Sequence, residues 1–179
     1  MKQVNIIIGR FQPITKGHMK CIEMMYNKLH IPTIIVMVES RHIDQRHPFV
    51  TEELIPIYKK MFRSNPMILD VTTAKSANIV EIGDDLYNMG YQIRSLVCGT
   101  DRYPAYHKMT TKYHDDALLS DDFELFEVER TDDDLSATKL RNAIQAGNFS
   151  EFKKLFPDCD TPMKIYKTLK IMMEENLKD

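Results

Sequence analysis

The chain has 179 residues, of which 43% are hydrophobic and 28% are charged, as in an ordinary soluble globular domain. Its formal net charge of −2 disfavours a general nucleic-acid binder, which would carry a strongly basic face. Its three cysteines are widely spaced and form no CxxC pair, which excludes a disulfide framework and a zinc knuckle. No apolar run approaches the ~20 residues of a membrane span, and none at the N-terminus resembles a signal peptide. We therefore expect a cytoplasmic protein with no membrane partner.

Apolar runs of strand length alternate with segments of helical period. The expected strands are residues 3–8, 33–38, 67–71, 95–98 and 123–128. Thr51 and Ser76 are expected to cap helices, the first of which contains Pro56 and could kink or begin later. This alternation predicts an α/β protein with a doubly wound, five-stranded parallel sheet.

The strand pattern stops after Gly147. Two amphipathic segments follow, "FSEFKKLF" and "TPMKIYKTLKIMMEENL", and they predict two closing helices. We expect an α/β core over residues 1–147 and a C-terminal helical extension over 148–179 packed on it. In a doubly wound sheet, ligands bind beyond the carboxyl ends of the strands, so the chemistry is expected in the turns after strands one, four and five.

The turn after the first strand reads "GRFQPITKGH", residues 9–18. If Thr15 is the N-cap of the next helix, then Lys16, Gly17 and His18 occupy its first three positions. The backbone amides there have no intrahelical partner, and such a helix start binds anions. Side chains lean toward the N-terminus of their helix, so His18 is expected to point back toward a bound phosphate. The alternative is an ordinary surface histidine on a helix start.

Small and rigid residues shape the same turn. Gly9 permits a close backbone approach at the end of the strand, Gly17 leaves room for a ligand, and Pro13 stiffens the loop. The helix dipole disfavours an isolated imidazolium at this position. We therefore expect His18 to hydrogen-bond a phosphate oxygen rather than to serve as a permanent cation.

A second candidate helix start follows the fifth strand in "DDDLSATKLRNAIQAG", residues 132–147. Ser136 is the expected N-cap, which would leave the next three backbone amides free. Thr138 and Arg141 are three residues apart on one helix face, where a hydroxyl and a guanidinium suit a polyphosphate tail. The alternative is a capped helix with solvated charges.

Both segments resemble signatures of one known family. "GRFQPITKGH" resembles the GRFxP-x-(H/T)-x-G-H signature of the HIGH-type nucleotidyltransferase superfamily, and "LSATKLR" resembles its ISSTxxR signature. The resemblance covers roughly residues 2–147. "GRFQP" together with "RHPFVTEEL" is most similar to archaeal-type nicotinamide mononucleotide adenylyltransferases. Thr15 departs from that type and matches the phosphopantetheine adenylyltransferases, and Ala137 replaces the second serine of ISSTxxR.

The resemblance implies a Rossmann-like nucleotidyltransferase fold and transfer of AMP from ATP to a phosphomonoester. Nicotinamide mononucleotide leads as the acceptor, giving NAD and pyrophosphate. Phosphopantetheine and a cytidylyltransferase reaction with CTP are the alternatives, and a non-catalytic nucleotide sensor is a third. His18 would bond the α-phosphate, Thr138 and Arg141 would hold the β- and γ-phosphates, and Lys16 and Arg10 would neutralise the leaving group or the acceptor phosphate.

Three further segments complete the expected site. Gly99 and Asp101 follow the fourth strand, where Asp101 could accept from ribose or adenine or could cap a helix. His42, Asp44 and His47 fit no standard zinc spacing. Arg46 and His47 follow the second strand and are expected phosphate contacts, as the resemblance to the archaeal-type enzymes implies. Mg²⁺ is expected mainly as a bridge between ATP phosphates, held by few or no protein carboxylates. The resemblance implies a homo-oligomer. The full expected nucleotide-binding set is Gly9, Arg10, Phe11, Thr15, Gly17, His18, Arg46, His47, Gly99, Asp101, Ser136, Thr138 and Arg141.

Overall fold

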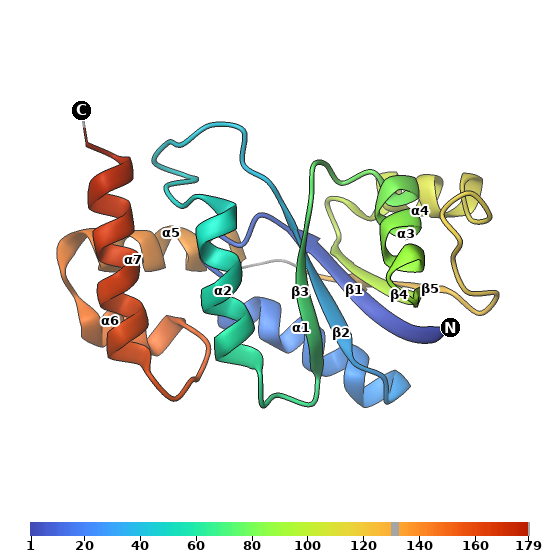
Figure 1. The fold of residues 1–179 in the computed structure, drawn as a ribbon, viewed down its shortest axis with the longest axis horizontal. Coiled ribbons are helices and arrows are strands. Elements are labelled where there is room, and N and C mark those ends of the chain that lie inside the picture. Colours follow the sequence, from blue (N-terminus) through green and yellow to red (C-terminus); the bar gives the residue numbers. More distant parts are fainter. Residues whose placement is uncertain (130–132, 179) are drawn as a thin grey trace. The chain divides into compact units, whose positions relative to one another are not determined.

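The computed structural model describes residues 1–129 and 133–178 of the chain, with the backbone alone for residues 133–135. Strands and helices alternate along the sequence and are followed by two further helices (Figure 1). The elements are β1 (Lys2–Gly9), α1 (Lys16–Leu29), β2 (Thr33–Val38), α2 (Thr51–Phe62), β3 (Ile68–Ala74), α3 (Ile79–Asn88), β4 (Tyr91–Gly99), α4 (Tyr103–Lys112), β5 (Glu124–Val128), α5 (Asp133–Ala146), α6 (Phe149–Leu155) and α7 (Pro162–Asn176).

The five strands form one sheet in the order β3-β2-β1-β4-β5, and every neighbouring pair is parallel. The order reverses at β1, which lies between β2 and β4. All six side chains of β2 are buried, as expected for a strand covered on both faces. The doubly wound, five-stranded parallel sheet expected from the sequence is confirmed.

Two layers of side chains cover the sheet. On one face, Val4 and Ile6 of β1 pack in a cluster that includes Ile82 of α3 and Tyr106 of α4. On the other face, the Ser95 hydroxyl donates to the Asn5 side chain at 2.6 Å and lies 3.4 Å from the sulfur of Met25 in α1. The central strands β1, β2 and β4 therefore hold the buried part of the sheet. Doubly wound sheets bind ligands beyond the carboxyl ends of their strands.

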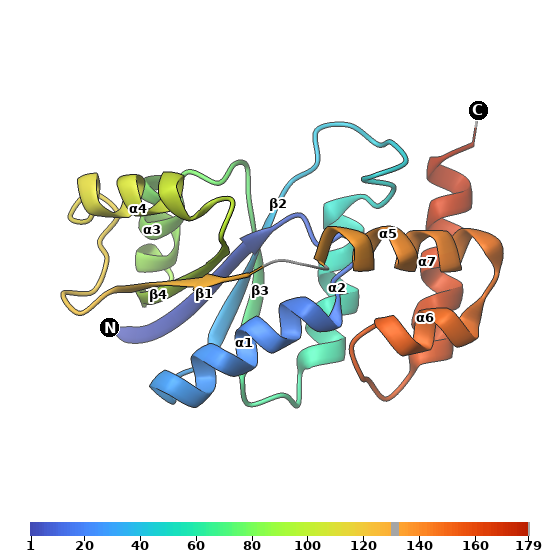
Figure 2. The ribbon, with the colours of Figure 1, turned by 180° about the vertical axis from the view of Figure 1, so that it is seen from behind.

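Contacts divide the chain into two compact units. The sheet unit comprises residues 1–9, 21–38 and 65–131, and the helical unit comprises 10–20, 39–64 and 132–179. Within the helical unit, α5, α6 and α7 pack on one another (Figure 2). An aromatic cluster fills the space between α6 and α7 and contains Phe149, Phe152, Phe156 and Tyr166. In the part of the chain that the structure describes, no helix has the length and apolarity needed to span a membrane.

Two expected helix caps are wrong. α2 begins at Thr51 itself, and the Thr51 hydroxyl accepts from the amide of Ser40 at 3.3 Å instead of capping its own helix. α2 also continues through Pro56. α3 is capped by Asn78 rather than Ser76, because Asn78 directly precedes the first buried residue of the helix. The Asn78 side chain accepts from two amides of the first turn.

Candidate functional site

The loop of residues 10–15, which joins β1 to α1, is held by hydrogen bonds from within the helical unit. The side-chain amide of Gln12 donates to the carbonyl of Phe49 and accepts from its backbone amide, both at 2.9 Å. Gln12 is only 4% exposed, so this paired contact is shielded from water. The hydroxyl of Tyr58 in α2 donates to the Phe11 carbonyl at 2.9 Å and accepts from the Ile14 amide at 3.0 Å.

Thr15 is the N-cap of α1, as the sequence predicts. Its hydroxyl accepts from the backbone amide of His18 at 3.3 Å, and its carbonyl accepts from the amide of Met19 at 3.2 Å. The imidazole of His18 completes a reciprocal cap, because its Nδ1 accepts from the Thr15 amide at 3.0 Å. Lys16, Gly17 and His18 therefore occupy the first three positions of the helix.

This reciprocal cap determines the protonation geometry of His18. A backbone amide can only donate, so Nδ1 presents its lone pair to Thr15 and the ring proton lies on Nε2. A doubly protonated ring would direct an N–H at another N–H. The edge of the ring packs against Phe11, with 4.8 Å between the centroids. The Thr15 contact therefore favours the tautomer whose N–H is on Nε2, and the donor role of His18 toward a phosphate stays a prediction.

The start of α1 is electropositive. α1 has no acidic residue in its first turn, a feature that it shares with α4 and α7, and it begins with Lys16. A lysine at this end opposes the helix dipole and adds to its positive potential. The ammonium of Lys16 lies 3.8 Å from a carboxylate oxygen of Asp158, whose side chain is fully exposed, so water screens this pair. The arrangement suits an anion.

The expected cap at Ser136 is wrong. α5 begins at Asp133, so Ser136 lies within the helix, and its side chain is half-buried. Each amide of an α-helix pairs with the carbonyl four residues earlier, which places the amides of Ala137, Thr138 and Lys139 in the helical ladder. The second signature therefore offers side chains, and not free amides, to a ligand.

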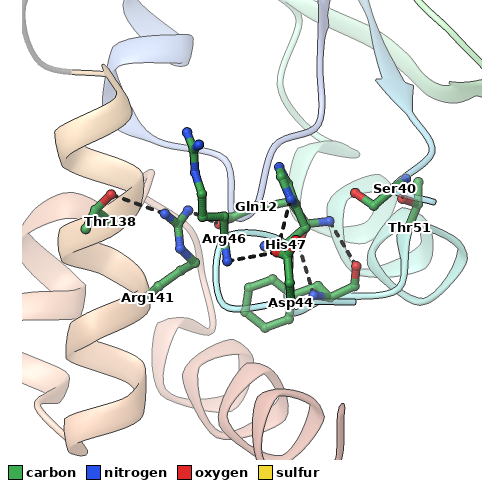
Figure 3. Close-up of polar contacts among 9 residues, drawn as sticks. Gln12, Ser40, Asp44, Arg46, His47, Thr51, Thr138 and Arg141 are labelled. Carbon is green, nitrogen blue, oxygen red and sulfur yellow. Dashed lines mark hydrogen bonds and ion pairs between the residues drawn. The ribbon is translucent and has the colours of Figure 1, made fainter. Parts of the chain in front are cut away.

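Arg141 links α5 to the first signature loop. One guanidinium nitrogen donates to the carbonyl of Gln12 at 2.9 Å, and another donates to the Thr138 hydroxyl at 3.1 Å (Figure 3). Thr138 and Arg141 thus share one helix face, as their spacing predicts. Two segments that are 129 positions apart in the sequence meet at Gln12 and Arg141.

The loop between β2 and α2 carries Arg46 and His47. A carboxylate oxygen of Asp44 accepts from the amide of Arg46 at 2.9 Å and from that of His47 at 2.7 Å, which fixes a tight turn (Figure 3). Partial burial, together with the positive charge of Arg10, lowers the pKa of His47 against the opposing pull of Asp44. Arg10, Arg46 and His47 therefore form a basic group beside the first loop.

The end of α7 also holds the loop between β2 and α2, since the side-chain amide of Asn176 donates to the carbonyl of Pro48 at 2.9 Å.

The remaining expected residues lie in the sheet unit. Gly9 is the last residue of β1, and Gly99 is the last residue of β4. Asp101 lies in the exposed turn that follows β4. α4 begins at Tyr103 with Arg102 at its N-cap, so Asp101 does not cap it. The roles of Gly9, Gly99 and Asp101 toward a ligand stay predictions.

Two residues of this site were missed by the sequence analysis. Tyr58 shares a buried helix face with Leu54 and Phe62, a spacing typical of core residues, so its hydroxyl gave no signal. Gln12 lies inside the first signature, but nothing in the sequence identifies Phe49 as its partner. Over residues 1–129 and 133–178, no three histidine, cysteine or acidic side chains form a group that could hold a metal ion.

A model of the cytidylyltransferase-like family matches residues 6–143 of the chain. The chain belongs to the cytidylyltransferase-like family. The match includes the loop, the α1 cap, Arg46, His47 and the α5 side chains. This places the chain among the HIGH-type nucleotidyltransferases, as the two signatures predict, and it is a nucleotidyltransferase enzyme. Among curated protein sequences, no significant match was found.

Solved structures share the fold of this cytidylyltransferase-like chain. A candidate nicotinate-nucleotide adenylyltransferase from Vibrio parahaemolyticus aligns over 97% of both chains, with a TM-score of 0.58 and 14% identity. A Plasmodium falciparum nicotinic acid mononucleotide adenylyltransferase complexed with NaAD aligns over 98% of both chains, with a TM-score of 0.53 and 12% identity. Thermotoga maritima TmcAL bound with alpha-thio ATP has a TM-score of 0.54 and 14% identity, covering 98% of this chain and 56% of that chain.

Proposed function

We propose that this nucleotidyltransferase transfers AMP from ATP to nicotinamide mononucleotide and releases pyrophosphate. The observation that carries the proposal is the bond from Arg141 to the Gln12 carbonyl at 2.9 Å, which joins the second signature to the loop that leads into the first helix start. One site thereby combines a neutral histidine donor, an electropositive helix start and a guanidinium beside a hydroxyl. These groups suit a polyphosphate undergoing attack at its α-phosphorus.

In this reaction an oxygen of the acceptor phosphate attacks the α-phosphorus of ATP. A new phosphorus–oxygen bond forms, and the bond from the α-phosphorus to the oxygen bridging the β-phosphate breaks. A phosphomonoester is largely a dianion near neutral pH, since its second pKa is about 6, so the attack needs no general base. Catalysis then comes from in-line positioning and charge stabilisation.

Each side chain has a distinct role in the proposal. The Nε2–H of His18 donates to the α-phosphate as negative charge builds on it. Arg141 and Thr138 bind the β- and γ-phosphates through the helix face that they share. Lys16 exchanges its screened contact with Asp158 for the leaving pyrophosphate. Mg²⁺ enters with ATP as part of the substrate and bridges its phosphates.

The acceptor phosphate is assigned to Arg10, Arg46 and His47. The Asp44 turn positions the last two, and the lowered pKa of His47 favours the neutral ring, which can donate without an added charge. The choice of a pyridine mononucleotide rests on the segments "GRFQP" and "RHPFVTEEL", which resemble those of archaeal-type nicotinamide mononucleotide adenylyltransferases. It is also supported by the fold shared with nicotinic acid mononucleotide adenylyltransferases.

An acceptor panel tests the proposal. Purified protein is given Mg²⁺ with ATP or CTP and one of three acceptors, and pyrophosphate release is followed. The acceptors are nicotinamide mononucleotide, nicotinic acid mononucleotide and phosphopantetheine. We expect the fastest release with ATP and nicotinamide mononucleotide, with NAD as the product, and release that is slower by roughly 100- to 1,000-fold from the His18→Ala variant. Faster release with another acceptor, or with CTP, would replace the substrate assignment, and no release with any pair would reject the enzyme assignment.

A further inference from the structure

We infer that Tyr58 is a positioning residue that acts through the backbone of loop 10–15 to fix the orientation of the His18 imidazole. Tyr58 lies in α2, outside both signatures. Its phenol is fully buried and makes two hydrogen bonds, both to the backbone of this loop. The inference deepens the proposed function, because His18 is the donor on which that function depends.

The connection from Tyr58 to His18 runs through two consecutive amides. The Ile14 amide donates to the Tyr58 hydroxyl at 3.0 Å, and the next amide, that of Thr15, donates to Nδ1 of His18 at 3.0 Å. Adjacent peptide planes share one Cα atom, so fixing the first amide restricts the direction of the second. Tyr58 therefore controls the donor that keeps the His18 proton on Nε2.

The other end of the loop is held by the same hydroxyl. The Tyr58 hydroxyl donates to the Phe11 carbonyl at 2.9 Å. Phe11 has a φ of 52°, a left-handed conformation that costs free energy for a residue with a Cβ and persists only where its surroundings enforce it. The ring of Phe11 in turn contacts the His18 ring. One phenol thus holds Phe11, which contacts the His18 ring, and Ile14, whose neighbour Thr15 bonds that ring.

Burial makes this contact durable. Desolvation raises the pKa of the Tyr58 phenol well above its ordinary value, so the hydroxyl remains protonated and able to donate at any pH near neutrality. Loss of the hydroxyl would leave a buried carbonyl and a buried amide without partners. The loop would then relax toward other arrangements, and the Thr15 amide would no longer be aimed at one imidazole nitrogen.

The Tyr58→Phe variant tests the inference, because it keeps the ring and removes only the hydroxyl. The matched control is Tyr166→Phe, which removes the hydroxyl of another buried tyrosine in the helical unit. The first readout is the His18 tautomer, measured by ¹⁵N NMR of the imidazole nitrogens without substrate. We expect a single Nε2–H form in the wild type and in Tyr166→Phe, and a mixture of tautomers in Tyr58→Phe. A wild-type tautomer in Tyr58→Phe would overturn the inference.

Kinetics supply the second readout. Tyr58→Phe should lower kcat by roughly tenfold with little change in KM, the scale of one lost hydrogen bond to a positioned group. In the His18→Ala background the same substitution should change kcat by less than about twofold, since the group that it positions is gone. An equal loss in both backgrounds would overturn the inference and assign Tyr58 to the stability of the fold.

A third measurement covers the case in which Tyr58→Phe does not fold. Hydrogen exchange of the Ile14 and Thr15 amides in the wild type should then be slow, as for buried, bonded amides. Exchange as fast as in an exposed loop would overturn the inference. The His18 tautomer is measured without substrate, so the positioning role can be tested apart from the proposed function. If the wild type were inactive with every acceptor but the tautomer changed in Tyr58→Phe, the proposed function would be rejected and the positioning role supported.

Discussion

The two helix starts that carry the signatures differ in how they present groups to a ligand. α1 begins at Lys16, immediately after the Thr15 cap. Its first turn carries the side chains of Lys16 and His18, which lie on either side of Gly17 in the sequence. α5 begins at Asp133, four residues before the first helical position expected with Ser136 as the cap, and it presents Thr138 and Arg141 from its second and third turns. In the proposed function, the first signature acts through a helix end and the second through a helix face. Positive charge comes from the helix dipole and Lys16 at α1 and from the Arg141 guanidinium at α5.

The largest effect that this comparison predicts is at His18. His18→Ala should lower kcat by roughly 100- to 1,000-fold, as when a transition-state donor is removed, while the ATP affinity changes little. His18→Asn is the informative companion, because its side-chain oxygen can still accept from the Thr15 amide but it lacks a donor at the place of Nε2. Both variants should lose kcat. A wild-type kcat in His18→Asn would show that His18 acts only through its cap contact with Thr15 and not as a donor to the substrate.

The next effect concerns ATP affinity and tests the helix-face mode of α5. Arg141→Ala should weaken ATP binding by roughly 10- to 100-fold, the scale of lost hydrogen bonds to charged groups, and should weaken acceptor binding much less. Arg141→Lys keeps the charge but loses the planar fork, so its affinity should fall between that of Arg141→Ala and the wild type.

The matched control for Arg141 is Lys139→Ala, which removes one exposed positive charge from the same helix. It should leave ATP affinity unchanged. Arg141→Ala also removes the bond to the Gln12 carbonyl, so a loss of thermal stability is expected whether or not the residue binds ATP. Titration with ATP is therefore the deciding measurement, and wild-type affinity in Arg141→Ala would contradict the polyphosphate assignment.

The contrast between the two helix starts also explains what could be predicted from the sequence. The strands, their parallel direction and the Thr15 cap follow from local patterns, namely apolar runs that alternate with helical segments and a threonine before a helical period. The start of α5 did not follow, since "DDDLS" holds several residues that can cap a helix and only the folded chain selects among them. The same ambiguity produced the wrong choice of Ser76 over Asn78.

Contacts between residues far apart in the sequence could not be predicted, for a different reason. The bonds from Gln12 to Phe49 and from Tyr58 to the loop join residues 37 to 47 positions apart, and no periodicity encodes such a pairing. A buried tyrosine on an apolar helix face gives the same pattern whether or not its hydroxyl is used. The division of the chain at residue 147 and the roles of Gly99 and Asp101 stay predictions.

A smaller effect is expected for the cap of α1. Thr15→Ala removes the hydroxyl that accepts from the His18 amide and should cost about 1 kcal/mol in the free energy of unfolding. Thr15→Ser retains the hydroxyl and should recover most of that loss. Denaturant titration of the two variants measures the difference. Equal stability of Thr15→Ala and the wild type would show that the helix end does not depend on this cap.

The smallest effect, at Ser136, separates the two helix starts most directly. Since α5 begins at Asp133, Ser136 is an interior residue, and alanine is the better helix former there. Ser136→Ala should therefore change the free energy of unfolding by no more than about 0.5 kcal/mol, against the larger loss in Thr15→Ala. Its ATP affinity should also stay at the wild-type value, because the amides after Ser136 are paired within the helix. A destabilisation equal to that of Thr15→Ala, accompanied by weaker ATP binding, would restore Ser136 as a cap and give α5 the same mode of anion binding as α1.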